Sequence, residues 1–254
     1  MEVSVLAGMP DNRGRSDNKW RRKTAGRGFI QHDLHGRVAH LLATAILRGD
    51  YAPETILPRE AELMETFGVS RTVLREALRT LTSKGLIESR PRVGTRVRPR
   101  SAWNLLDVDV LDWYSRVAEP MTFALKLQEM REMIEPYAAA LAAASHTDET
   151  FAALEAAHTA MAAARNVDEW VRADLRFHLS VLTACSNELL IPLGTLIERT
   201  LEAQLRLNAR RAQVYNASLA EHTAVFEAIR ARDAAVAQQA MAGLLGVTRR
   251  RIEG

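Results

Sequence analysis

The chain has 254 residues, 47% of them hydrophobic and 26% charged, which suffices for one large or two modest packed domains. A single cysteine excludes a framework of intramolecular disulfides. With no apolar run of about 18 residues and no signal-peptide core, we expect a cytoplasmic protein without membrane contact. The charge is uneven. Residues 1–100 hold 19 Lys and Arg against 11 Asp and Glu, a net of +8, whereas residues 101–254 hold 15 against 20, a net of −5. Only the first part is suited to a polyanion.

The amino-terminal segment, residues 1–28, mixes small polar residues with seven basic ones and has no helical or strand periodicity. This composition predicts a disordered basic arm, which either adds affinity for phosphate or is simply a solvated tail. From 32 to 47 apolar residues recur at helical spacing, and Gly49 ends this predicted helix.

Around Gly68 the sequence has the pattern of two helices joined by a tight turn. In the first and shorter helix, four residues are expected to face the core: Ala61, Leu63, Met64 and Phe67. The second begins after Ser70, the expected N-cap, and has an apolar face at helical spacing. That face consists of Leu74, Ala77, Leu78 and Leu81. Three arginines lie on its flank: Arg71, Arg75 and Arg79.

After Gly85, residues 89–97 alternate like a small hairpin. A basic hairpin that follows two such helices makes a winged helix-turn-helix, whose wing places arginines on phosphate or in a minor groove. We therefore predict that residues 29–98 form a winged helix-turn-helix domain that binds double-stranded DNA. A winged helix used for protein contacts is the alternative. The predicted DNA-binding residues are Arg71, Thr72, Arg75, Arg90, Arg92 and Gly94.

Residues 99–119 form a connector whose centre, 103–113, is too apolar for a free linker. Everything after Pro120 has helical periodicity without a strand pattern. The expected helices cover 107–117, 121–144, 148–164, 168–184, 188–211, 218–232 and 234–252. The predicted fold class is therefore mainly α, with an all-α antiparallel helical bundle over 120–254.

One of these helices carries ionisable residues on an apolar face, because Asp174 and His178 lie four residues apart between Val171 and Val181. Burying such groups costs several kcal/mol unless they pair or bind a metal. His222, on the inward stripe of another helix, is the expected third member. One Asp and two His can hold a divalent cation and leave positions open for a ligand. A structural hydrogen bond between the acid and an imidazole is the alternative.

Arg131 lies on a second inward stripe, which also contains Leu127, Ile134, Ala138 and Leu141. An inward guanidinium suits bidentate binding of a carboxylate. The alternative is a buried ion pair with Asp174 or Glu135. The candidate effector-binding residues are Arg131, Asp174, His178 and His222, and the last three are also the candidate metal ligands.

The amino-terminal motifs resemble the signature of the GntR family of bacterial transcription regulators. The matching residues are Leu57-Pro58, Glu60, Val69-Ser70-Arg71, Arg75-Glu76-Ala77-Leu78, Gly85 and Gly94-Thr95. The helical part is similar to the FCD effector domain of the FadR subfamily. Two positions depart from the family pattern: Ala61 stands where a DNA-contacting arginine occurs, and Glu54 where a turn glycine is common.

The resemblance implies a homodimeric repressor that leaves its operator when a small acidic metabolite binds the helical domain. The similarity of the connector to that of a sugar-acid regulator implies an aldonate, galactonate first. Asp174, His178 and His222 fall on three positions of the family's metal site, and Leu244, which cannot ligate, falls on the fourth. A three-ligand site for a divalent metal, with zinc as first candidate, and the absence of any metal both stay open.

Two other functions are alternatives to a metabolite-responsive regulator. One is a regulator for which the cation itself is the signal, and the other is a metal-dependent enzyme with an appended DNA-binding domain. The missing fourth ligand argues against the first, because a weak, open site discriminates metals poorly by geometry. No nucleophile or general base with a positioned partner accompanies the trio, which argues against the second. We therefore expect a ligand-responsive regulator and not an enzyme.

Overall fold

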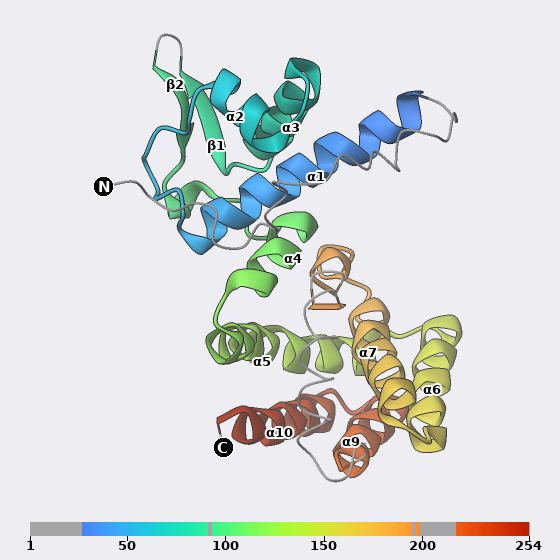
Figure 1. Ribbon diagram of the computed structural model, residues 1–254. Helices are drawn as coiled ribbons and strands as arrows, with labels where there is room; N and C mark the ends of the chain where they lie inside the picture. The colour runs from blue at the N-terminus through green and yellow to red at the C-terminus, as the bar shows by residue number, and fades with distance from the viewer. Residues whose placement is uncertain (1–26, 91–92, 195–196, 199–216, 254) are drawn as a thin grey trace. The chain divides into compact units, whose positions relative to one another are not determined.

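The computed structural model describes residues 27–90, 93–194, 197–198 and 217–253. It divides into two compact units, Met1–Leu105 and Leu106–Gly254 (Figure 1). The division falls inside the predicted connector. The predicted basic arm lies outside the described residues except for its last two, which belong to the first helix.

The described part of the first unit contains three α-helices and a two-stranded sheet: α1 (Arg27–Arg48), α2 (Glu60–Phe67), α3 (Arg71–Ser83), β1 (Ile87–Arg90) and β2 (Gly94–Val97), followed by the 3-10 helix η1 (Arg100–Ala102). Helix α1 begins earlier than the predicted start at 32 and packs against α3. Val38, Leu42 and Ile46 are buried on it, whereas Leu41 of the same apolar repeat is exposed.

The predicted turn and cap between α2 and α3 are confirmed. Gly68 ends α2 with a φ of 62°, in the left-handed region, and the Ser70 hydroxyl accepts a hydrogen bond from the Val73 amide at 3.4 Å. The apolar face of α3 is buried as expected. Ala61, predicted to turn inward, is exposed, because it lies about 200° around the helix from the buried Leu63.

The hairpin of β1 and β2 is antiparallel, with Ile87 opposite Val97 and Arg90 opposite Gly94. Ile87 and Val97 are buried and so anchor the hairpin to the helices. Glu54, in the turn before α2, has a φ of 69°, which explains why a glycine suits this position. Arg96 offsets the strain, because its Nε donates to the Glu54 carbonyl at 3.0 Å and its Nη2 to the Glu54 carboxylate at 2.9 Å. These elements form the predicted winged helix-turn-helix.

The described residues of the second unit form helices joined by turns and short connections, without a strand. Its named helices are α4 (Val108–Val117), α5 (Pro120–Ser145), α6 (Asp148–Ala163), α7 (Val167–Ala184), α9 (Leu219–Arg230) and α10 (Ala234–Glu253). Residues 191–194 and 197–198 are also helical, but most of the predicted helix 188–211 lies outside the described residues. The mainly α fold class is confirmed. None of the described helices is long and apolar enough to cross a membrane.

Helix α5 lies along α10, α6 lies along α7, and α9 packs against α5, α6 and α10 (Figure 1). Residues from these five helices build one apolar core. Leu141, predicted to face inward, is 42% exposed, because the buried face of α5 continues through Ala138, Ala142 and Ala143 and leaves Leu141 at its edge. Within this core a small set of polar side chains is also buried.

Candidate functional site

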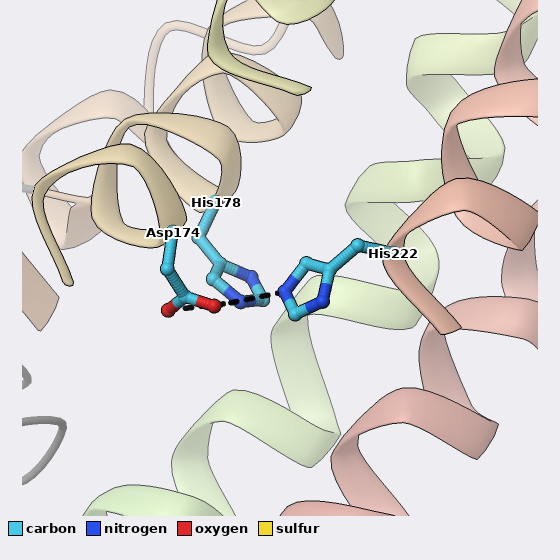
Figure 2. A group of neighbouring side chains, drawn as sticks. All are labelled: Asp174, His178 and His222. Carbon is cyan, nitrogen blue, oxygen red and sulfur yellow. Dashed lines mark ion pairs between the residues drawn. The ribbon is translucent and has the colours of Figure 1, made fainter. Parts of the chain in front are cut away.

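Helices α7 and α9 bring the three predicted metal ligands together (Figure 2). Helix α7 begins at its Asn166 cap and presents Asp174 and His178 one turn apart, while His222 projects from the first turn of α9. All three are at most 3% exposed. One ligand atom from each lies within 4.8 Å of the others, so a single cation could contact all three.

The His222 ring has a defined tautomer. Its Nδ1 lies 2.7 Å from the Ser218 carbonyl, which can only accept a hydrogen bond, so Nδ1 carries the proton. The other nitrogen, Nε2, lies 3.0 Å from Oδ1 of Asp174 without hydrogen-bond alignment. Oδ2 of Asp174 has no hydrogen-bond partner within the described part of the chain. A cation between the carboxylate and Nε2 would satisfy both.

The His178 ring is held from two sides by helix α5. Its Nδ1 lies 2.6 Å from Oε2 of Glu135, and its Nε2 lies 3.0 Å from Nη2 of Arg131. A guanidinium only donates, so Nε2 accepts and the proton belongs on Nδ1, beside Glu135. Nε2 also faces Oδ2 of Asp174 at 3.9 Å. A carboxylate behind the ring and an unprotonated nitrogen in front form a usual arrangement for a metal-binding histidine.

Arg131 and Glu135 form a buried ion pair, with Nε of the arginine 2.6 Å from Oε1 of the glutamate. Burial alone would raise the pKa of Glu135, but the Arg131 guanidinium and His178 outweigh it and hold that pKa at about 2. Burial also opposes ionisation of Asp174, yet the neighbouring His222, His178 and Arg131 keep its pKa below the usual value. Both carboxylates are therefore ionised at neutral pH.

Of the two possibilities for Arg131, the structure shows the buried ion pair, while binding of an effector carboxylate stays a prediction. Arg131 pairs with Glu135, one of the two acids considered, and it still directs Nη2 toward the histidine cluster. Glu135 itself was not predicted as a site residue. The sequence contained the relevant pattern, because Glu135 lies one helical turn after Arg131, but only the packing of α5 on α7 shows that it supports His178.

These donors fit a divalent cation of the zinc type. The Asp174 carboxylate and one nitrogen of each imidazole face the cation position. Behind the rings, the Glu135 carboxylate contacts His178 and the Ser218 carbonyl contacts His222.

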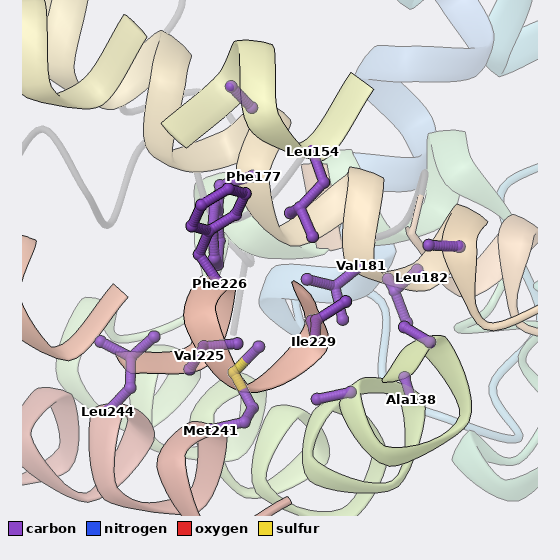
Figure 3. Packing of buried hydrophobic residues seen from close by; sticks show 14 of the residues in the cluster. Ala138, Leu154, Phe177, Val181, Leu182, Val225, Phe226, Ile229, Met241 and Leu244 are labelled. Carbon is purple, nitrogen blue, oxygen red and sulfur yellow. The ribbon is translucent and has the colours of Figure 1, made fainter. Parts of the chain in front are cut away.

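The fourth position of the family pattern adds no ligand. Leu244 is 2% exposed and lies among Val225 and Met241 in the apolar cluster (Figure 3). From the described residues, a cation held here would have three protein ligands, with positions left for oxygen atoms of a bound molecule.

The predicted DNA-binding residues lie in the other unit. Arg71, Thr72 and Arg75 are exposed on the N-terminal half of α3, the half that reads base edges in helix-turn-helix proteins. Arg90 is exposed at the end of β1, and Gly94 begins β2 with a φ of 112°. Arg92 lies outside the described residues. The exposed arginines make this surface basic, as the charge distribution of the sequence indicated.

Comparison with known proteins agrees with both units. Residues 34–97 match the family described as bacterial regulatory proteins of the gntR family, and residues 126–246 match the FCD domain. The uncharacterised HTH-type transcriptional regulator YieP of Escherichia coli is 40% identical over 169 residues, 65% of this chain and 74% of that one. The galactonate operon transcriptional repressor of Escherichia coli is 34% identical over 219 residues, 85% of this chain and 96% of that one.

A solved structure of Lar, which controls expression of the Listeria monocytogenes agr system, shares the fold, with a TM-score of 0.60 at 19% identity, and covers 87% of this chain and 96% of that one. The matching families and relatives are transcription regulators and not enzymes, which decides against the enzyme alternative. The chain belongs to the GntR family of DNA-binding transcription regulators and, with its FCD domain, to the FadR type.

Proposed function

We propose that this protein is a homodimeric repressor of a sugar-acid operon and that an aldonate, with galactonate as first candidate, releases it from DNA. The buried cluster in the FCD domain carries the proposal. Arg131 offers a guanidinium for a carboxylate, while Asp174, His178 and His222 offer a cation site with open positions. An aldonate has a carboxylate and a hydroxyl on neighbouring carbons, which suits both groups at once.

The galactonate assignment is supported by the similarity to the galactonate operon repressor, which spans 96% of that protein. FCD domains commonly bind metal, and the buried Asp174, His178 and His222 group of this domain could hold one. When bound, the cation would supply a positive charge that binds the carboxylate and hydroxyl oxygens of the acid. The operator of such a protein lies in the bacterial cytoplasm, so we place its action there.

The test is thermal unfolding of the purified protein with galactonate, with and without zinc. A ligand at 100 times its dissociation constant stabilises the native state by about 2.7 kcal/mol, which is visible as a higher Tm. Galactitol, which lacks the carboxylate, is the matched control compound. We expect a shift with galactonate that zinc increases, and none with galactitol. Equal behaviour of the two compounds would contradict the proposed effector class.

A regulator that responds to the cation alone is the second candidate, since the Asp174, His178 and His222 cluster is fully buried. Operator affinity, measured with zinc and then with a chelator in the absence of any acid, separates the two. Under our proposal the chelator leaves operator affinity within a few-fold of its starting value, and galactonate lowers that affinity. A large loss or gain on chelation alone would favour the metal sensor.

A further inference from the structure

Nε2 of His178 has two possible partners in this site. It accepts from Nη2 of Arg131 at 3.0 Å, and it is also the nitrogen that faces Asp174, at 3.9 Å from Oδ2. An imidazole nitrogen has one lone pair in the ring plane, so it either accepts a hydrogen bond or binds a cation. We infer that Arg131 and the divalent cation compete for this atom, and that cation binding frees Arg131 for the acid. The inference rests on the proposed function.

Turning the His178 ring over does not avoid the conflict. The ring is buried between α5 and α7, with Nδ1 2.6 Å from the ionised Glu135. In a flipped ring each nitrogen would exchange places with a ring carbon, so C–H groups would face the guanidinium and the carboxylate and both hydrogen-bonding contacts would be lost. The cation therefore has to take the lone pair that Arg131 now uses.

The displaced guanidinium stays in the site. Its Nε remains 2.6 Å from Oε1 of Glu135, and this contact does not involve His178. Only the Nη2 end loses its acceptor, and a buried donor without an acceptor is costly. The carboxylate of a bound acid supplies that acceptor. Cation and acid thus favour the same position of Arg131, and each must raise the affinity for the other by the same factor.

The first experiment measures zinc affinity by titration calorimetry without any acid. Arg131→Lys keeps the positive charge beside Glu135 but removes the Nη2 group that donates to His178. We expect it to bind zinc roughly tenfold or more tightly than wild type, since a hydrogen bond to a charged donor no longer competes. Arg249→Lys is the matched control, because Arg249 pairs with Glu132, outside the cluster, at 2.7 Å. Its zinc affinity should equal that of wild type.

Equal zinc affinity of Arg131→Lys and wild type would overturn the competition. Should Arg131→Lys fail to fold, the double variant Arg131→Gln/Glu135→Gln is compared with Glu135→Gln alone. Both have the same group behind His178, and only the first lacks the competing guanidinium. The double variant must bind zinc more tightly, and equal or weaker binding would again overturn the inference.

The second experiment repeats the titration with saturating galactonate. Wild type should gain zinc affinity, and Arg131→Lys should gain much less, because its acid-binding group is altered and its competitor is already gone. A gain of equal size in both would overturn the coupling. Tighter zinc binding by Arg131→Lys without any galactonate effect supports the competition but contradicts galactonate as the effector. Absence of zinc binding to wild type contradicts both the proposed metal and this inference.

Discussion

Replacing Arg75 by alanine separates DNA recognition from folding. The Arg75 side chain is 62% exposed on α3, and its one ion pair with a described residue joins its Nε to the exposed Glu60 over 3.9 Å. An exposed pair of this kind contributes at most about 1 kcal/mol, so the free energy of unfolding should change by less than about 1 kcal/mol. A bidentate arginine–guanine contact contributes about 1 to 3 kcal/mol to binding, so the operator Kd should rise roughly 5- to 150-fold.

Fluorescence anisotropy with the operator and its single-base variants, at several salt concentrations, measures this change. Arg79→Ala is the control, because Arg79 lies one turn further along α3 and pairs with Glu76 at 2.7 Å. It should weaken binding evenly across sequences, whereas Arg75→Ala should also relax the preference at one base pair. A folded Arg75→Ala protein with wild-type affinity and preference would show that α3 does not read the operator through this residue.

Three further outcomes are expected. Gly68 and Gly85 both have a positive φ, so alanine at either position is strained. Gly68→Ala should lower the free energy of unfolding in urea by about 1 kcal/mol. Gly85→Ala should lower it by about 2 to 4 kcal/mol, because its Cβ would also lie 2.7 Å from the Ala102 carbonyl oxygen. The pKa of Glu135 is about 2, against an ordinary value of 4.5, so its ionised form adds about 3 kcal/mol to the free energy of unfolding. This stabilisation is complete above pH 4.5 and is lost as the pH falls toward 2. In chelator-treated protein, Glu135→Gln should flatten this part of the urea stability profile. Galactarate, with a second carboxylate, should give a smaller rise in Tm than galactonate.

The DNA-binding unit was predictable because its elements are specified locally. Ser70 caps α3 and the apolar spacing after it fixes one face, so both features are visible in a dozen residues of sequence. The predictions of burial that are wrong concern residues at the edges of such apolar faces. Ala61 and Leu141 have apolar side chains at helical spacing, yet both are exposed, because spacing alone does not show how wide a surface the neighbouring helix covers.

The cluster in the helical unit was predictable only in part. The separation of Asp174 from His178 placed them on one face of one helix, and the inward stripe that contains His222 suggested a partner. The part played by Glu135 depends on which helix packs against α7 and in what register, and this is a long-range property. The sequence therefore indicated the three donors that face the cation site, but not the carboxylate behind His178.

The composition of the buried cluster argues for binding and against a purely structural role. Metal binding through Nε2 requires one proton on each imidazole, and in that state Arg131 contributes one positive charge and Glu135 and Asp174 contribute two negative ones. Stability alone would favour a neutral pair or apolar residues here, because replacing buried ion pairs by well-packed hydrophobic side chains is often neutral or stabilising. A divalent cation would change the net charge of the site from −1 to +1, and one carboxylate would then bring it to zero. The charge balance therefore favours an acid with a single carboxylate, as an aldonate has.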